Sequence, residues 1–100
     1  MKMIVCCCNI SVINELRDIL NDEKIDNYQI VDQVTGKCVR GLPRLNTAVW
    51  PGMNTLTLCY LEKSAADRLV EAVKRHNASF TSDDEAIMVA GWEIDTWIPG

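Results

Sequence analysis

The chain of 100 residues has the length of one domain, and we expect residues 1–100 to form it. Hydrophobic residues make up 48% of the chain and charged residues 24%, which excludes the disordered class. The net charge of −4 argues against nucleic acid as a partner, because phosphate neutralisation needs clustered Lys and Arg, and it argues equally against an anionic membrane surface.

The N-terminal apolar run is short and stops at Asn9 without a cleavage-site pattern. No stretch approaches the roughly 18 apolar residues of a membrane span, so we expect no membrane insertion and a cytoplasmic location. Five cysteines, three of them adjacent, fit that location, and we interpret them as buried reduced thiols that pack like small hydrophobic side chains. They are Cys6, Cys7, Cys8, Cys38 and Cys59.

The predicted elements begin with a strand over residues 2–10 that is apolar on both faces. Met3, Val5 and Cys7 point to one face, and Ile4 and Cys6 are among those that point to the other. Such a strand must be covered on both sides, which is a first indication of an oligomer.

Apolar residues at helical spacing predict a helix from about Ser11 to Glu23, with Ser11 as its start signal. A second strand is predicted over residues 28–38. The stretch 39–54 holds two prolines and two glycines without a sustained period, and we expect a long, partly mobile loop there.

A third strand is predicted over residues 55–61, followed by a helix that starts at Ser64 and closes with basic residues. A polar loop over 78–85 and a fourth strand over 86–97 complete the pattern. The order predicts an α+β, ferredoxin-like βαββαβ fold, with a four-stranded antiparallel sheet and two helices on one face. We expect the bare face of that sheet to meet copies of the chain.

Candidate catalytic groups are few, because the only histidine, His76, closes a helix. A surface helix cap is the favoured interpretation of this residue, and we expect the chain not to be an enzyme. For a divalent metal ion, the leading candidate ligands are His76 with the acidic run Asp83, Asp84 and Glu85, although no CxxC or HxxxH spacing is present.

The segment 36–41 offers the cations Lys37 and Arg40 between two glycines. Backbone amides in such a turn can hold an anion, although an ordinary solvated loop is the favoured interpretation.

Two short motifs resemble those of the nitrogen-regulatory PII signalling proteins. Val34-Thr35-Gly36 is similar to the Val-x-Gly that ends their second strand, and Ala86-Ile87-Met88-Val89 stands where they have Lys-Ile-Phe-Val. The resemblance covers nearly the whole chain, mostly as pattern.

This resemblance implies a homotrimer that binds ATP or ADP in clefts between subunits. It also implies that the loop after the second strand contacts enzymes, transporters or regulators. The implied ligand-binding residues are Gly36, Lys37, Arg40 and Ile87. The expected partner is a membrane transporter or a regulatory protein. Trp50 would contact it, because Trp is a frequent interface anchor, and packing within the trimer is the alternative for this residue.

One motif departs from the family pattern. PII proteins carry Gly-Asp-Gly-Lys before the fourth strand, whereas this chain has Ser82-Asp83-Asp84-Glu85-Ala86. Two unit charges about 4 Å apart interact by about 4 kcal/mol near a protein surface, so the carboxylates argue against the usual ATP binding. The chain thus resembles divergent PII-like proteins, some of them similar to accessory proteins of heavy-metal efflux systems. The alternative is a metal-binding protein of the trimeric CutA type, involved in heavy-metal tolerance.

Overall fold

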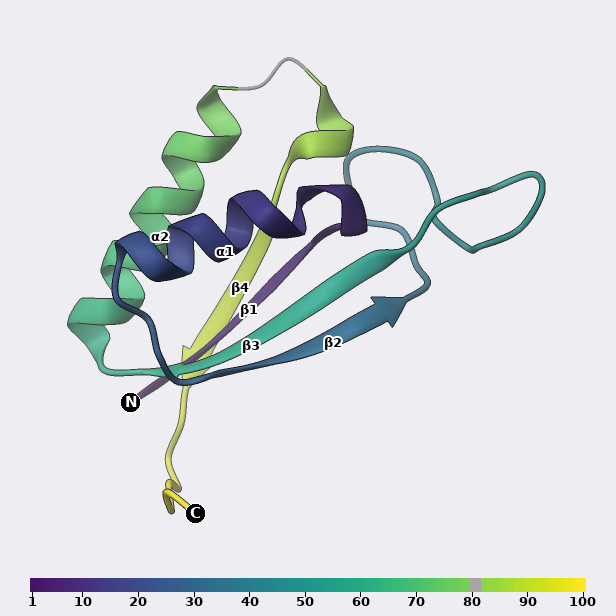
Figure 1. The fold of residues 1–100 in the computed structure, drawn as a ribbon. Coiled ribbons are helices and arrows are strands. Elements are labelled where there is room, and N and C mark those ends of the chain that lie inside the picture. The colour runs from purple at the N-terminus through teal and green to yellow at the C-terminus, as the bar shows by residue number, and fades with distance from the viewer. Residues whose placement is uncertain (80–81) are drawn as a thin grey trace.

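The computed structural model describes residues 1–79 and 82–100, in which four strands form one antiparallel sheet. The strands are β1 (Lys2–Asn9), β2 (Tyr28–Val34), β3 (Asn54–Leu61) and β4 (Met88–Glu93). The helices are α1 (Ile13–Asp22) and α2 (Lys63–Ala78), with short 3₁₀ helices η1 (Ile10–Val12) and η2 (Asp83–Glu85) before α1 and β4. Both long helices cover the same side of the sheet (Figure 1). The predicted ferredoxin-like order is confirmed.

The strand order β2-β3-β1-β4 places β1 and β3 in the middle of the sheet. In this register Cys6 lies opposite Thr57, whereas Cys7 lies opposite Leu56 on β3 and Met88 on β4. Successive residues of a strand point to opposite faces, so Cys6 faces the helices and Cys7 faces away from them.

The hydrophobic core fills the space between the helices and the sheet. Leu16 and Leu20 of α1 and Leu69 of α2 are at most 1% exposed. Cys6 and Cys59 are fully buried among these side chains as free thiols, which confirms the interpretation of the core cysteines as small hydrophobic residues. Burial raises the pKa of the Cys6 thiol to about 12, so this group stays neutral.

The sheet face opposite the helices, which we call the open face, is largely apolar. Trp92 is 51% exposed and Val31 43% exposed on this face. The apolar residues that the register places there are Met3, Val5, Cys7, Val31, Leu56, Leu58, Tyr60, Met88, Ala90 and Trp92. β1, β3 and β4 thus each contribute several apolar residues to the uncovered face, as predicted for β1, and β2 contributes Val31.

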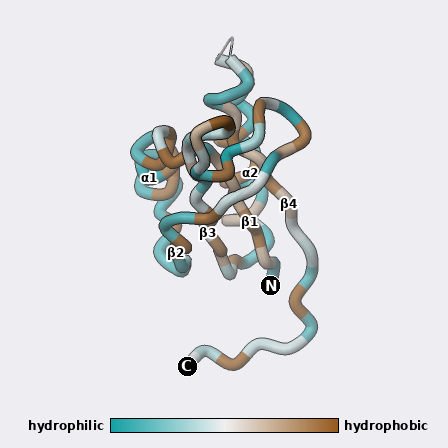
Figure 2. The backbone as a smooth tube through the Cα atoms, turned by 90° about the vertical axis from the view of Figure 1, so that its right-hand side faces the viewer, coloured by the Kyte–Doolittle hydropathy of each residue, from teal (hydrophilic) through white to brown (hydrophobic). Residues whose placement is uncertain are grey.

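The chain beyond β4 covers only one end of the open face. Trp97 stacks on Tyr60, with their ring centroids 5.3 Å apart, while the rest of this segment extends beyond the sheet (Figure 2). Within residues 1–79 and 82–100, neither helix combines the length and the apolar character needed to cross a membrane.

Two predicted strands extend too far. β4 ends at Glu93 instead of Trp97, because Glu93 is already opposite Lys2, the first residue of its partner β1. β2 ends at Val34 instead of Cys38, because the backbone then leaves β3 and Gly36 pairs with Arg44.

Both predicted helix starts are also displaced. Asn9, not Ser11, caps the first helical turn, since its side-chain Oδ1 accepts a hydrogen bond from Ser11 N at 3.1 Å. α2 begins at Lys63 without a side-chain cap bond, and Lys63 forms an ion pair with Asp67 one turn later, at 2.9 Å.

Truncation of the core at Leu69 should destabilise the protein strongly. We expect Leu69→Ala to lower the free energy of unfolding by about 2–5 kcal/mol, because it removes buried contacts and leaves a cavity. Leu42→Ala makes the same change at a side chain that is 62% exposed, and it should stay within about 0.5 kcal/mol of the wild type. Urea titrations of both variants measure the difference, and equal effects would contradict the assigned core.

Candidate ligand-binding site

The connection between β2 and β3, residues 35–53, is organised by its own hydrogen bonds. Gly36 and Arg44 exchange two backbone hydrogen bonds of 2.9 and 2.8 Å, which close the first part of the connection into a loop. The second part turns back where Asn46 N donates to Gly52 O at 3.0 Å, and Gly52 has a φ of 90°, a value that favours glycine. The predicted long loop therefore consists of two shorter loops, and backbone hydrogen bonds join the two ends of each.

Arg44 fixes these loops to the body of the protein. Arg44 is only 6% exposed, and its guanidinium Nη1 donates to Asn54 Oδ1 at 2.8 Å. Its Nη2 donates to Asp84 Oδ1 at 3.2 Å. One buried cation thus joins the connection, the first residue of β3 and the 3₁₀ helix η2.

Arg40 makes a second link to η2 at the surface. Its Nε and Nη2 both donate to Asp83 Oδ1, at 2.9 and 2.5 Å. The Arg40 side chain remains 64% exposed and that of Asp83 51% exposed, so this pair contributes little stability.

Asn77, at the end of α2, positions the start of β4. Its Nδ2 donates to Ile87 O at 2.9 Å and its Oδ1 accepts from Ile87 N at 2.8 Å, so one amide satisfies both backbone groups. The neighbouring His76 has its Nε2 3.0 Å from Glu85 O and donates to it in the Nε2-protonated tautomer.

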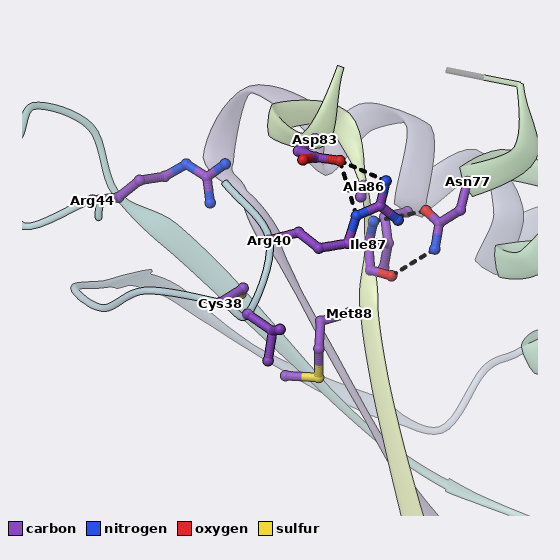
Figure 3. Close-up of a pocket in the computed structure, with 9 residues that line it drawn as sticks. Cys38, Arg40, Arg44, Asn77, Asp83, Ala86, Ile87 and Met88 are labelled. Atoms are coloured by element: carbon purple, nitrogen blue, oxygen red, sulfur yellow. Dashed lines mark hydrogen bonds and ion pairs between the residues drawn. The ribbon is translucent and has the colours of Figure 1, made fainter. Parts of the chain in front are cut away.

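These links enclose a cavity of about 150 Å³ between the connection, the end of α2 and the start of β4 (Figure 3). Arg40 and Asp83 face each other at one side of it, and Met88 lies below them. Its lining includes Cys38, Arg40, Arg44, Asn77, Ile87 and Met88. The site therefore combines an apolar wall with a charged rim, a composition typical of small-molecule sites.

The structure divides the predicted ligand residues between two pockets. Arg40 and Ile87 line the cavity just described. Gly36 and Lys37 line an adjoining pocket of about 430 Å³, together with Cys7 and Met88.

The predicted metal ligands are engaged elsewhere. Asp83 and Asp84 pair with the two arginines, and His76 contacts the Glu85 backbone instead of its carboxylate. Among all described residues, no three His, Cys, Asp or Glu side chains gather in a group that could hold a metal ion. The divalent-metal hypothesis receives no support from this arrangement.

Trp50, the predicted partner contact, lies near the tip of the connection. It is 38% exposed, beside Val49, which is 76% exposed, and both line a shallow pocket with Leu42. The exposure of these apolar side chains is compatible with a partner contact, which stays a prediction.

Sequence reasoning missed Arg44 and Asn77. Arg44 lies in a Pro- and Gly-punctuated stretch that gives no sign of burial, although Leu42 and Leu45 flank it. Asn77 follows His76 at the end of the helix. The sequence signal for its role was an Asn side chain at a helix end, because its short amide can form hydrogen bonds to the backbone of a following strand.

A scan against protein-family models matches none, and no curated protein matches the chain in sequence. Solved structures do match. A PII-like signalling protein of Thermus thermophilus shares 14% identity with a TM-score of 0.63, over 91% of this chain and 83% of that one.

CPII from Thiomonas intermedia K12 matches in two complexes, each over 95% of this chain and 88% of CPII. The complex with ADP and bicarbonate has 13% identity and a TM-score of 0.65. The complex with ADP, AMP and bicarbonate has 12% identity and a TM-score of 0.66. This chain therefore has the fold of PII-like signalling proteins, as the sequence motifs predicted.

Loss of the buried arginine should destabilise the fold around the site. We expect Arg44→Ala to lower the free energy of unfolding by about 1–3 kcal/mol, because the buried Asn54 amide oxygen loses its donor. Arg40→Ala removes an exposed pair and should cost less than about 1 kcal/mol. Urea denaturation compares the two variants, and an Arg44→Ala protein as stable as the wild type would show that the contact is unimportant.

Proposed function

We propose that this chain is a non-enzymatic, PII-like signalling protein that assembles as a homotrimer in the cytoplasm. In this proposal a small anionic ligand binds where Arg40 meets Asp83. The connection 35–53 reports occupancy to a partner, either a membrane transporter or a regulatory protein.

The Arg40–Asp83 pair carries the proposal. The Arg40 guanidinium is largely exposed and lines the cavity. It donates both of its hydrogen bonds to a single carboxylate oxygen, Asp83 Oδ1. A phosphate or carboxylate group can accept hydrogen bonds from the same two nitrogens of Arg40 and can replace Asp83, because an exposed ion pair holds its partners weakly. The ligand would thereby free Asp83 and loosen the connection from η2.

The charges around the site also suit an anion better than the sequence suggested. Two of the three carboxylates of the acidic run are matched by arginines, since Asp83 pairs with Arg40 and Asp84 with the buried Arg44. The negative charge of the run is therefore partly neutralised, and Arg40, the exposed one of the two arginines, is the group that an incoming anion reaches. CPII, which shares the fold, binds ADP, AMP and bicarbonate, so an adenine nucleotide or a small carboxylate-like anion is the proposed ligand class.

The size of the cavity supports a site completed by a second copy. Pockets that enclose small organic ligands measure about 300–1,000 Å³, and the cavity of about 150 Å³ is smaller than this. Met88 belongs both to the cavity lining and to the open face. A copy packed on the open face would therefore border the cavity and enlarge its walls, as an inter-subunit cleft does.

Ligand binding should depend on Arg40. We expect isothermal titration calorimetry with ADP, AMP, ATP and bicarbonate to detect saturable binding of at least one of them. Arg40→Ala should weaken it about tenfold to hundredfold, since hydrogen bonds to charged groups contribute about 1.5–3 kcal/mol.

Arg68→Ala is the matched control, because Arg68 is an exposed arginine on α2 outside the cavity. Equal loss in both variants, or no binding of any of the four compounds, would count against the proposal. Parallel titrations with Cu²⁺ and Zn²⁺ test the CutA-type alternative, which predicts saturable metal binding that is lost in Asp84→Ala.

Assembly should depend on the open face. We expect light scattering after size-exclusion chromatography to give the mass of a trimer, and Leu58→Asp to give a monomer, because the substitution places a charge in an apolar contact. Leu42→Asp introduces the same charge in the exposed connection and should leave the trimer intact. A wild-type protein that is monomeric at micromolar concentration would contradict the inter-subunit site.

A further inference from the structure

Two of the five thiols stand apart from the helix-side core. Cys7 is the cysteine of β1 whose side chain faces the open side of the sheet, and Cys38 lies in the connection after β2. Their Sγ atoms are 3.8 Å apart, although the residues are 31 positions apart in sequence. Cys7 is 6% exposed and Cys38 is half-buried, so solvent reaches the pair from the connection side.

We propose that Cys7 and Cys38 are a reversible redox pair, which closes to a disulfide by exchange with a low-molecular-weight disulfide such as oxidised glutathione.

The geometry requires only a small movement. A disulfide has an S–S distance of about 2.0 Å, so the two sulfurs must approach by about 1.8 Å. Cys7 is held between two strand partners, whereas Cys38 belongs to no strand or helix. Near Cys38, an added Cβ on Gly36 would meet no atom within 4 Å, so the space beside Gly36 is open.

The exchange proceeds in two balanced steps. The more accessible Cys38 thiolate attacks one sulfur of the small disulfide, forming a mixed disulfide and releasing one small thiol. Cys7 then attacks the Cys38 sulfur, which breaks the mixed disulfide and releases the second small thiol. The two electrons pass from the cysteine pair to the oxidant, and the two protons end on the released thiols.

Burial controls the rate of the second step. Desolvation raises the pKa of Cys7 to about 12, with Cys38 and Cys8 acting in the same direction and the nearby Arg44 opposing them. Cys7 is therefore almost wholly neutral at pH 7. As long as the pH is below that pKa, each increase of one pH unit raises the thiolate fraction of Cys7 about tenfold. Closure should be slow at neutral pH and accelerate as the pH rises.

Closure would fix the start of the connection to the central strand of the sheet. Cys38 lies two residues before Arg40 and lines the same cavity, so the bond restrains the segment that bears the proposed anion-binding group. This consequence for ligand binding rests on the proposed function, whereas the disulfide itself does not.

The test uses the whole protein and needs no ligand. Native protein is incubated with oxidised glutathione at pH 7, 8 and 9, then denatured and alkylated. We expect the number of alkylated thiols to fall from five to three, faster at higher pH. A tryptic digest should contain residues 38–40 joined to residues 3–17, because trypsin cleaves after Lys2, Arg17, Lys37 and Arg40.

The variants identify the partners. Cys38→Ser should keep its four thiols, while Cys7→Ser should keep a persistent glutathione adduct on Cys38. Cys59→Ala is the control, since this buried thiol of β3 faces the core, and it should close the disulfide like the wild type. Five remaining thiols, a wild-type glutathione adduct that does not resolve, or a linkage found only in covalent dimers would overturn the proposal.

Discussion

The arrangement of the site depends on one buried cation. Arg44 comes from a connection without regular secondary structure, yet it is almost fully buried and bonds to Asn54 and Asp84. A buried guanidinium is tolerated only where its donors are satisfied, so the positions of the connection, β3 and η2 are set together. The cavity lies beside this junction, where the connection and η2 meet the end of α2 and the start of β4. Its rim, including Arg40, is placed by the same constraint.

The sequence predicted the fold well because its information is periodic. Alternation in β1 and helical spacing around Leu16 and Leu69 give the type of each element directly. The ends were harder, because they depend on partners that no local pattern shows. β4 ends at Glu93, which is paired with Lys2, the first residue of β1. The first helical turn is capped by Asn9, which is the last residue of β1 and lies before the predicted helix start at Ser11.

The candidate site was less predictable for a related reason. Charges were assessed along the chain, where Asp83, Asp84 and Glu85 form one acidic block. In space two of these carboxylates face arginines at least 40 residues away, so the local charge differs from the charge of the block. Arg40 was identified because a cation between glycines is visible locally. Asn77 was missed because its bonds to Ile87 form only after α2 and β4 meet.

The position of β1 in the sheet has a consequence for how the chain is made. β1 is a central strand, and both strands that pair with it come later in the chain, from residues 54–61 and 88–93. During synthesis, β1 therefore has apolar residues on both faces and no strand partner until more than half of the chain has emerged. Pairing over such separations is slow, and exposed strand edges promote association. The nascent chain is thus most prone to aggregation before Leu61 is available, and helix α1 is the element able to shield β1 in that interval.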